Sequence, residues 1–161
     1  MDKFKGKYRI PSARWPSWDY GSNAAYFITI CTAHWSTYFG RIVDGAMIRS
    51  SLGQAARDCW CRIPDHFPFA VLGASVVMPN HVHGVITIDK PDGVNHWETN
   101  TFGPQSRNLA SIVRGYKIGV TKYAYQHGIA FEWQARYYDH VIRNADDYER
   151  IERYISQNPQ N

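Results

Sequence analysis

The sequence predicts one α+β domain of ferredoxin-like type, in which helices pack on an antiparallel sheet. Two observations carry this prediction. Short segments rich in β-branched and aromatic residues alternate with longer segments that have one apolar helical face, in the order β(β)αββαβα. The chain also has 161 residues, of which 44% are hydrophobic, and this suits one compact domain with a hydrophobic core. We therefore expect a single domain over residues 1–161.

The first element is an extended basic arm over residues 1–24. Prolines and a glycine interrupt regular structure there, and three large aromatic residues are expected to anchor the arm on the domain. Its charged residues before position 15 are basic with one exception: Lys3, Lys5, Lys7, Arg9 and Arg14 stand against Asp2 alone. The arm is therefore a candidate for binding a polyanion.

A strand follows over residues 25–31, which are rich in β-branched and aromatic side chains. A second short strand over residues 41–48, turning at Asp44-Gly45, is predicted to pair with it. Ser50 or Ser51 then caps a helix, and Pro64 is expected to stop that helix. The apolar residues of this helix recur at helical spacing on one face: Leu52, Ala55, Ala56, Cys59, Trp60 and Ile63.

Two further strands are predicted at residues 70–78 and 81–88, joined by a turn at Pro79-Asn80. Residues 89–106 lack apolar periodicity and contain two prolines and two glycines, which is typical of a surface loop. An amphipathic helix over 107–126 and a strand near 136–142 come next.

Asn144 is predicted to be the N-cap of the last helix, with acidic residues in its first turn.

The helix predicted at 107–126 carries its charge on the side opposite its apolar face. Residues 107–123 contain four basic residues and no acid: Arg107, Arg114, Lys117 and Lys122. Together with Arg9 and Arg14 of the arm, they are candidate DNA-phosphate contacts. The alternative is that they are ordinary solvated side chains, since the net charge of +4 is modest.

No apolar run approaches the roughly 18 residues that a membrane helix needs, and no apolar segment follows the basic N-terminus. Three cysteines cannot all pair within one chain, which fits a reducing compartment. We therefore expect a cytoplasmic protein without a membrane partner.

His81 and His83 stand two residues apart in the strand predicted at 81–88, so both side chains leave the same face of the sheet. Val82 and Ile86 point the other way, towards the helix-packed core. Two adjacent imidazoles on a rigid strand can chelate one divalent cation. A His-x-His triplet alone is common by chance, but here it follows a buried strand and a tight turn.

The stretch Met78-Pro79-Asn80-His81-Val82-His83-Gly84 resembles the His-hydrophobe-His (HUH) motif of single-tyrosine transposases of the small insertion-sequence type. Further segments are similar to the REP-associated tyrosine transposases in the same order along the chain: KYRIPSARWPSWDYG, FGPQSRNLASIVRGYK, FEWQARYYDHVIRN and YERIERYISQNP. Together they span nearly the whole chain. The resemblance therefore implies an HUH-type fold and the activity of this family.

By the motif Tyr-Ile-x-x-Asn-Pro, the resemblance implies that Tyr154 is the catalytic tyrosine and that Asn158 completes a metal site with His81 and His83. Residues four apart share one helix face, so Tyr154 and Asn158 can approach the same phosphate. Gln157 is the alternative oxygen donor. Nitrogen and oxygen ligands without thiolate suit Mg²⁺ or Mn²⁺.

The activity implied is a metal-dependent endonuclease and transposase that cleaves and rejoins single-stranded, hairpin-containing DNA through a 5′-phosphotyrosine. Two alternatives stay open: a zinc hydrolase using His81, His83 and His140, and a non-catalytic nucleic-acid-binding module. A monomer and a homodimer that exchanges its tyrosine helices are both compatible with the sequence. The chain ends at Asn161, where members of the family often continue, so a truncated C-terminus also stays open.

Overall fold

The structure, a computed structural model, describes residues 24–90 and 108–158. Three predictions fall outside these residues: the basic arm with Arg9 and Arg14, most of the surface loop, and Arg107. Within the described part of the chain, no helix is both long enough and apolar enough to cross a bilayer.

Four strands form one antiparallel sheet in the order β4-β5-β1-β6. These strands are β1 (Ala24–Cys31), β4 (Ala70–Met78), β5 (His81–Ile88) and β6 (Tyr138–Ile142). The helices are η2 (Ala33–Trp35, a 3-10 turn), α1 (Ser51–Cys61), α2 (Ile63–His66), α3 (Leu109–Gln126) and α4 (Ala145–Ser156). Leaving aside the hairpin described below, this is the ferredoxin-like arrangement, and the predicted α+β fold class is confirmed.

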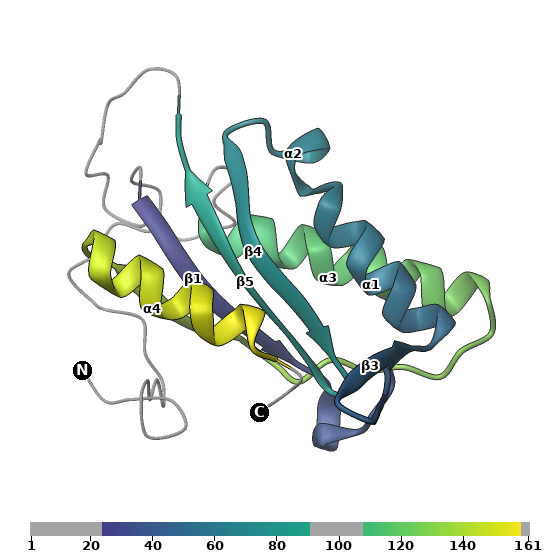
Figure 1. Cartoon of the computed structure of the whole chain (residues 1–161). Helices are drawn as coiled ribbons and strands as arrows, with labels where there is room; N and C mark the ends of the chain where they lie inside the picture. The colour runs from purple at the N-terminus through teal and green to yellow at the C-terminus, as the bar shows by residue number, and fades with distance from the viewer. Residues whose placement is uncertain (1–23, 91–107, 159–161) are drawn as a thin grey trace.

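Helices cover both faces of the sheet (Figure 1). In this view α4, in yellow, crosses in front of the sheet, while α1 and α3 lie behind it. Successive residues of β1 alternate between the two sides: Tyr26 and Ile28 join the large core under α1 and α3, and Phe27 joins a smaller core under α4. The sheet is therefore buried on both faces, and α4 forms a layer of its own.

The segment 41–48 does not pair with residues 25–31, and that prediction was wrong. It forms a separate hairpin of β2 (Gly40–Val43) and β3 (Ala46–Arg49). Asp44 and Gly45 have φ values of 50° and 77°, which suit a two-residue turn that reverses the chain at once. The hairpin satisfies its backbone groups internally, so β1 pairs with β5 and β6 instead.

The sequence predicted that Pro64 stops the first helix, but Pro64 instead lies at the start of the next helix. Helix α1 ends at Cys61, and Pro64 lies in the first turn of α2, where a missing N–H leaves no helical bond unmade. Arg136 adopts a left-handed φ of 69°, so β6 begins only at Tyr138. The caps are as predicted: Ser50 Oγ accepts from Gly53 N at 3.0 Å, and Asn144 Oδ1 accepts from Asp147 N at 2.8 Å.

Gly84 of β5 allows α1 to approach the sheet closely. A Cβ placed on Gly84 would lie 2.1 Å from Cζ2 of Trp60, and the indole of Trp60 is 2% exposed. The ring therefore occupies the space that any side chain at position 84 would need. Because His83 precedes Gly84 and points to the opposite face, Trp60 supports β5 on the face opposite the histidine pair.

We expect Gly84→Ala to lower the free energy of unfolding by about 1–3 kcal/mol, because the indole cannot move without disturbing the core. Gly119→Ala is the matched control. Its Cβ would make only ordinary contact with Cys59 Sγ at 3.4 Å, and alanine favours the interior of helix α3 by about 0.5–1 kcal/mol. Urea unfolding of both variants measures the two changes, and equal effects would contradict the role given to Trp60.

Candidate functional site

The two histidines of β5 lie side by side on the face that α4 covers. Their ring centroids are 4.4 Å apart, at an interplanar angle of 68°. His81 is partly exposed, whereas His83 is fully buried. In the sheet, Cys31 pairs with His81 and Thr29 pairs with His83, so β1 supplies the neighbours of both rings. Strand alternation thus produces the shared face that the sequence predicted.

Each imidazole is oriented through its Nδ1 atom. His81 Nδ1 lies 2.7 Å from Asn80 Oδ1, and Asn80 Nδ2 donates to the Trp35 carbonyl, which orients the amide. His81 Nδ1 therefore carries the proton and Nε2 carries the lone pair. His83 Nδ1 lies 2.8 Å from Thr29 Oγ1. Outer bonds of this kind fix metal-binding histidines in proteins, so the two side chains fit a site for a divalent cation.

Helix α4 places Tyr154 beside this pair. The centroid of its ring lies 5.6 Å from that of His83 and 6.2 Å from that of Phe27, both in edge-to-face arrangements. Ile151 and Ile155 are buried against Phe27 and hold the helix on the sheet. Tertiary packing therefore brings Tyr154 and His83 together from distant parts of the sequence.

Asn158 lies just beyond the end of α4, one turn after Tyr154. Its Nδ2 donates to the Tyr154 carbonyl at 3.1 Å, so the amide nitrogen, rather than the oxygen, is bound to the helix backbone. The oxygen-donor role that the resemblance implies for Asn158 stays a prediction.

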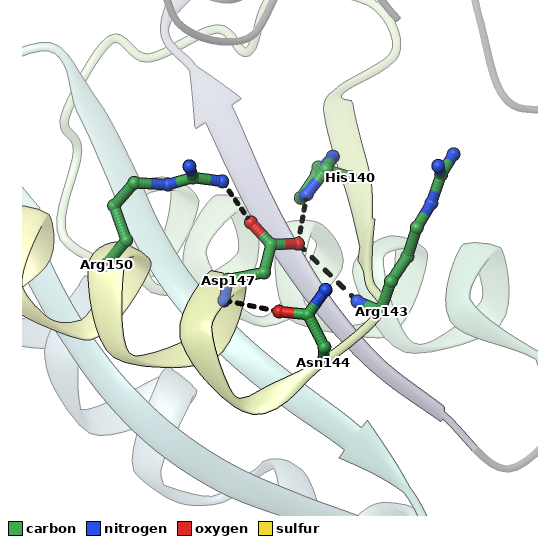
Figure 2. Close-up of polar contacts among 5 residues, drawn as sticks. All are labelled: His140, Arg143, Asn144, Asp147 and Arg150. Carbon is green, nitrogen blue, oxygen red and sulfur yellow. Dashed lines mark hydrogen bonds and ion pairs between the residues drawn. The ribbon is translucent and has the colours of Figure 1, made fainter.

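A buried polar network joins the start of α4 to β6 (Figure 2). His140 Nε2 donates to Asp147 Oδ2 at 2.8 Å, and both residues are only 7% exposed. Arg150 binds the other carboxylate oxygen, and the Arg143 backbone N–H donates to Oδ2 at 3.4 Å. The sequence indicated Asp147 only as an acid near a helix start and Asn144 only as a cap. The pairing of Asp147 with His140 could be seen only in the tertiary structure.

His140 is therefore engaged with Asp147 rather than with the histidine pair. Among residues 24–90 and 108–158, no group of three His, Cys, Asp or Glu side chains could hold a metal ion. The alternative zinc site of His81, His83 and His140 is not assembled in the fold. The reason is that His140 lies on β6, where its Nε2 atom donates a hydrogen bond to Asp147 of α4.

Burial lowers the pKa of His140 below its ordinary value, even though the hydrogen bond and charge of Asp147 raise it. Burial raises the pKa of Asp147, but the hydrogen bond and charge of His140, followed by the bond from Arg150, lower it below its usual range overall. Near neutral pH the pair is thus a neutral imidazole donating to a carboxylate.

We expect acidification to destabilise the fold through His140. Its folded pKa lies below the unfolded value, so the unfolded state binds the proton more readily. The stability linked to His140 is complete above the unfolded pKa of about 6.5 and is lost as the pH falls towards the folded pKa. Asp147 adds a loss below about pH 4. The melting temperature of His140→Gln should change less between pH 8 and 5 than that of the wild type; parallel curves would refute this.

The three described residues among the predicted phosphate contacts all lie on α3, on the face of the sheet opposite the histidine pair. Arg114 and Lys122 are exposed, and Lys122 lines a groove of about 670 Å³ between α1, α2 and α3. Lys117 is not a freely solvated cation: its Nζ donates to the Gln134 carbonyl at 3.0 Å and the Arg136 carbonyl at 2.7 Å. Burial lowers the pKa of Lys117. Contact of these residues with DNA stays a prediction.

Comparisons with known proteins give one sequence relative and one solved structure of similar fold. An uncharacterised protein of Haemophilus influenzae is 36% identical over 162 residues, covering 96% of this chain and 90% of that protein. The solved structure of a REP-associated tyrosine transposase bound to a REP hairpin is similar with a TM-score of 0.63 and 21% identity, covering 92% of this chain and 73% of that one. No protein-family model matches the sequence. The solved structure supports the fold described above.

Proposed function

From two premises we propose that this chain is a tyrosine transposase that cleaves and rejoins single-stranded DNA. The chain belongs to one protein family with the Haemophilus influenzae relative, and it has the fold of a REP-associated tyrosine transposase. The observation that carries the proposal is the position of Tyr154, whose ring lies 5.6 Å from that of His83 and next to the His81–His83 pair. A nucleophile beside a pair of imidazoles that can bind a cation is a suitable arrangement for metal-assisted phosphoryl transfer to a protein side chain.

In this proposal His81, His83 and Asn158 hold Mg²⁺ or Mn²⁺. Bound there, the cation would neutralise charge on a non-bridging phosphate oxygen and make the phosphorus more electrophilic. Thr29 and Asn80 orient the two imidazoles, and Ile151 and Ile155 hold the helix that presents Tyr154. In this proposal the cation site combines β5 with the residue just beyond α4, and α4 supplies the nucleophile.

The covalent step is a transesterification. The Tyr154 phenol oxygen attacks the phosphorus of a phosphodiester and loses its proton to solvent. The bond from phosphorus to the 3′-oxygen breaks, and that oxygen takes up a proton as a free 3′-OH. The downstream strand is left as a 5′-phosphotyrosine. One phosphodiester replaces another, so a 3′-OH can reverse the step and join strands without an external energy source.

The substrate class proposed is single-stranded DNA that contains a hairpin. The similar transposase was solved bound to a REP hairpin, which motivates this choice for the present chain. The basic segments of the sequence are compatible with a nucleic-acid partner.

The test is an adduct assay with hairpin-bearing single-stranded DNA and Mg²⁺ or Mn²⁺. We expect a denaturation-resistant protein–DNA adduct when the DNA is labelled at its 3′ end, and a shortened free strand when it is labelled at its 5′ end. Peptide mapping should place the phosphodiester on Tyr154. Absence of any adduct would support a hydrolase or a binding module, and transfer of the 5′ label to the protein would reverse the proposed polarity.

A further inference from the structure

Three residues of the last helix, and Asn158 just beyond its end, are spaced as one helical stripe. Asp147, Ile151, Tyr154 and Asn158 follow at intervals of four, three and four residues, which places them on a single helix face. Asp147 and Tyr154 are seven residues apart, so about 10 Å of helix separates them. The helix face that presents Tyr154 to His83 therefore also presents Asp147 to His140, two turns earlier.

The sheet carries matching partners for the two ends of this stripe. His140 pairs with Phe27, and Phe27 pairs with Val85, in one row across β6, β1 and β5. Thr29 and His83 form the next row on the same face, two residues along β1. One end of α4 thus contacts β6 through a polar pair, and the other end contacts His83 of the histidine pair on β5.

We propose that His140 and Asp147 are positioning residues for Tyr154, and that together they fix the rotation and the axial position of α4 on the sheet. The inference rests on the proposed function, because it concerns the position and orientation of the proposed nucleophile. Apolar packing at Ile151 and Ile155 is non-directional and would tolerate small rotations of the helix. A buried hydrogen bond to a carboxylate is directional and short, and therefore restricts them.

The rest of the network stiffens the carboxylate itself. Asp147 Oδ2 accepts from both the His140 ring and the Arg143 backbone, while Arg150 binds Oδ1 and Asn144 caps the Asp147 backbone N–H. Sliding or rotating the helix would separate His140 from Asp147 inside a buried layer, where both are 7% exposed. Tyr154 would then move relative to His83, and a displacement of about 1 Å can cost about 100-fold in rate.

The experiment compares His140→Ala with His140→Gln, which keeps an N–H donor near the Nε2 position. At saturating DNA and metal ion, we expect His140→Ala to form the Tyr154 adduct about 10–100-fold more slowly, with DNA affinity changed by less than about threefold. His140→Gln should recover most of the rate. Glu149→Ala is the matched control, since it removes an exposed ion pair with Arg153 from the same helix and should leave the rate unchanged.

A second readout does not require activity. With ring-labelled tyrosine, the NMR resonance of Tyr154 reports its position against the rings of Phe27 and His83. It should shift in His140→Ala and return in His140→Gln. An unshifted resonance would overturn the positioning role, as would an unchanged adduct rate. A wild-type protein that forms no adduct, but whose Tyr154 resonance responds as described, would instead refute the proposed function and leave the positioning role supported.

Discussion

Tyr154→Phe is expected to lower adduct formation by about 10³-fold or more, to the detection limit of the assay. The substitution removes the only atom of this side chain that can attack phosphorus. It keeps the ring that packs edge-to-face on Phe27 and His83, so the fold should survive. DNA binding, measured by fluorescence anisotropy at equilibrium, should change by less than about threefold because every charged side chain remains.

Tyr148→Phe provides the matched control for this variant. Tyr148 lies on the same helix and packs at the same small core, over Gly73 of β4. Its loss of a hydroxyl should leave the adduct yield essentially as in the wild type. An adduct that persists in Tyr154→Phe, or disappears only in Tyr148→Phe, would move the nucleophile away from position 154.

The second large effect is expected at the histidine pair. His81→Ala should reduce adduct formation by about 100-fold or more, and a chelator should abolish it in the wild type. The variant leaves one imidazole where the sheet now presents two with centroids 4.4 Å apart. His81 is the better target because it is partly exposed, whereas His83 is fully buried and its removal would also open the core.

Binding of Mn²⁺ to the DNA-free protein, followed by electron paramagnetic resonance, isolates this effect from catalysis. We expect weaker binding in His81→Ala and unchanged binding in His127→Ala, which removes an exposed imidazole stacked on Tyr123. Equal Mn²⁺ affinity in the wild type and His81→Ala would remove the histidine pair from the metal site.

Periodicity and capping chemistry made much of the fold predictable. Alternation in residues 81–88 predicted which side His81 and His83 would take, and Asn144 predicted the start of α4, because both depend on local geometry. Residues 41–48 were assigned to the wrong partner, since pairing depends on which strands compete for the same edge.

The finer parts of the site depend on contacts between distant elements. The His140–Asp147 pair and the two carbonyl bonds of Lys117 join segments whose proximity no local pattern encodes. A helical wheel placed Lys117 in solvent because it cannot represent the loop that later covers that side chain. The resemblance likewise implied a role for Tyr154 but did not indicate the His140–Asp147 pair, which forms between β6 and α4.

The contact between Trp60 and Gly84 has a consequence for genetics. The indole supports the backbone directly behind His83, although it sits on the side of the sheet that faces α1. In a screen for loss of the proposed DNA cleavage, substitutions at Trp60 should therefore have the same effect as substitutions at His83. Such variants would act indirectly: loss of the indole on one face of β5 would displace His83 on the other face.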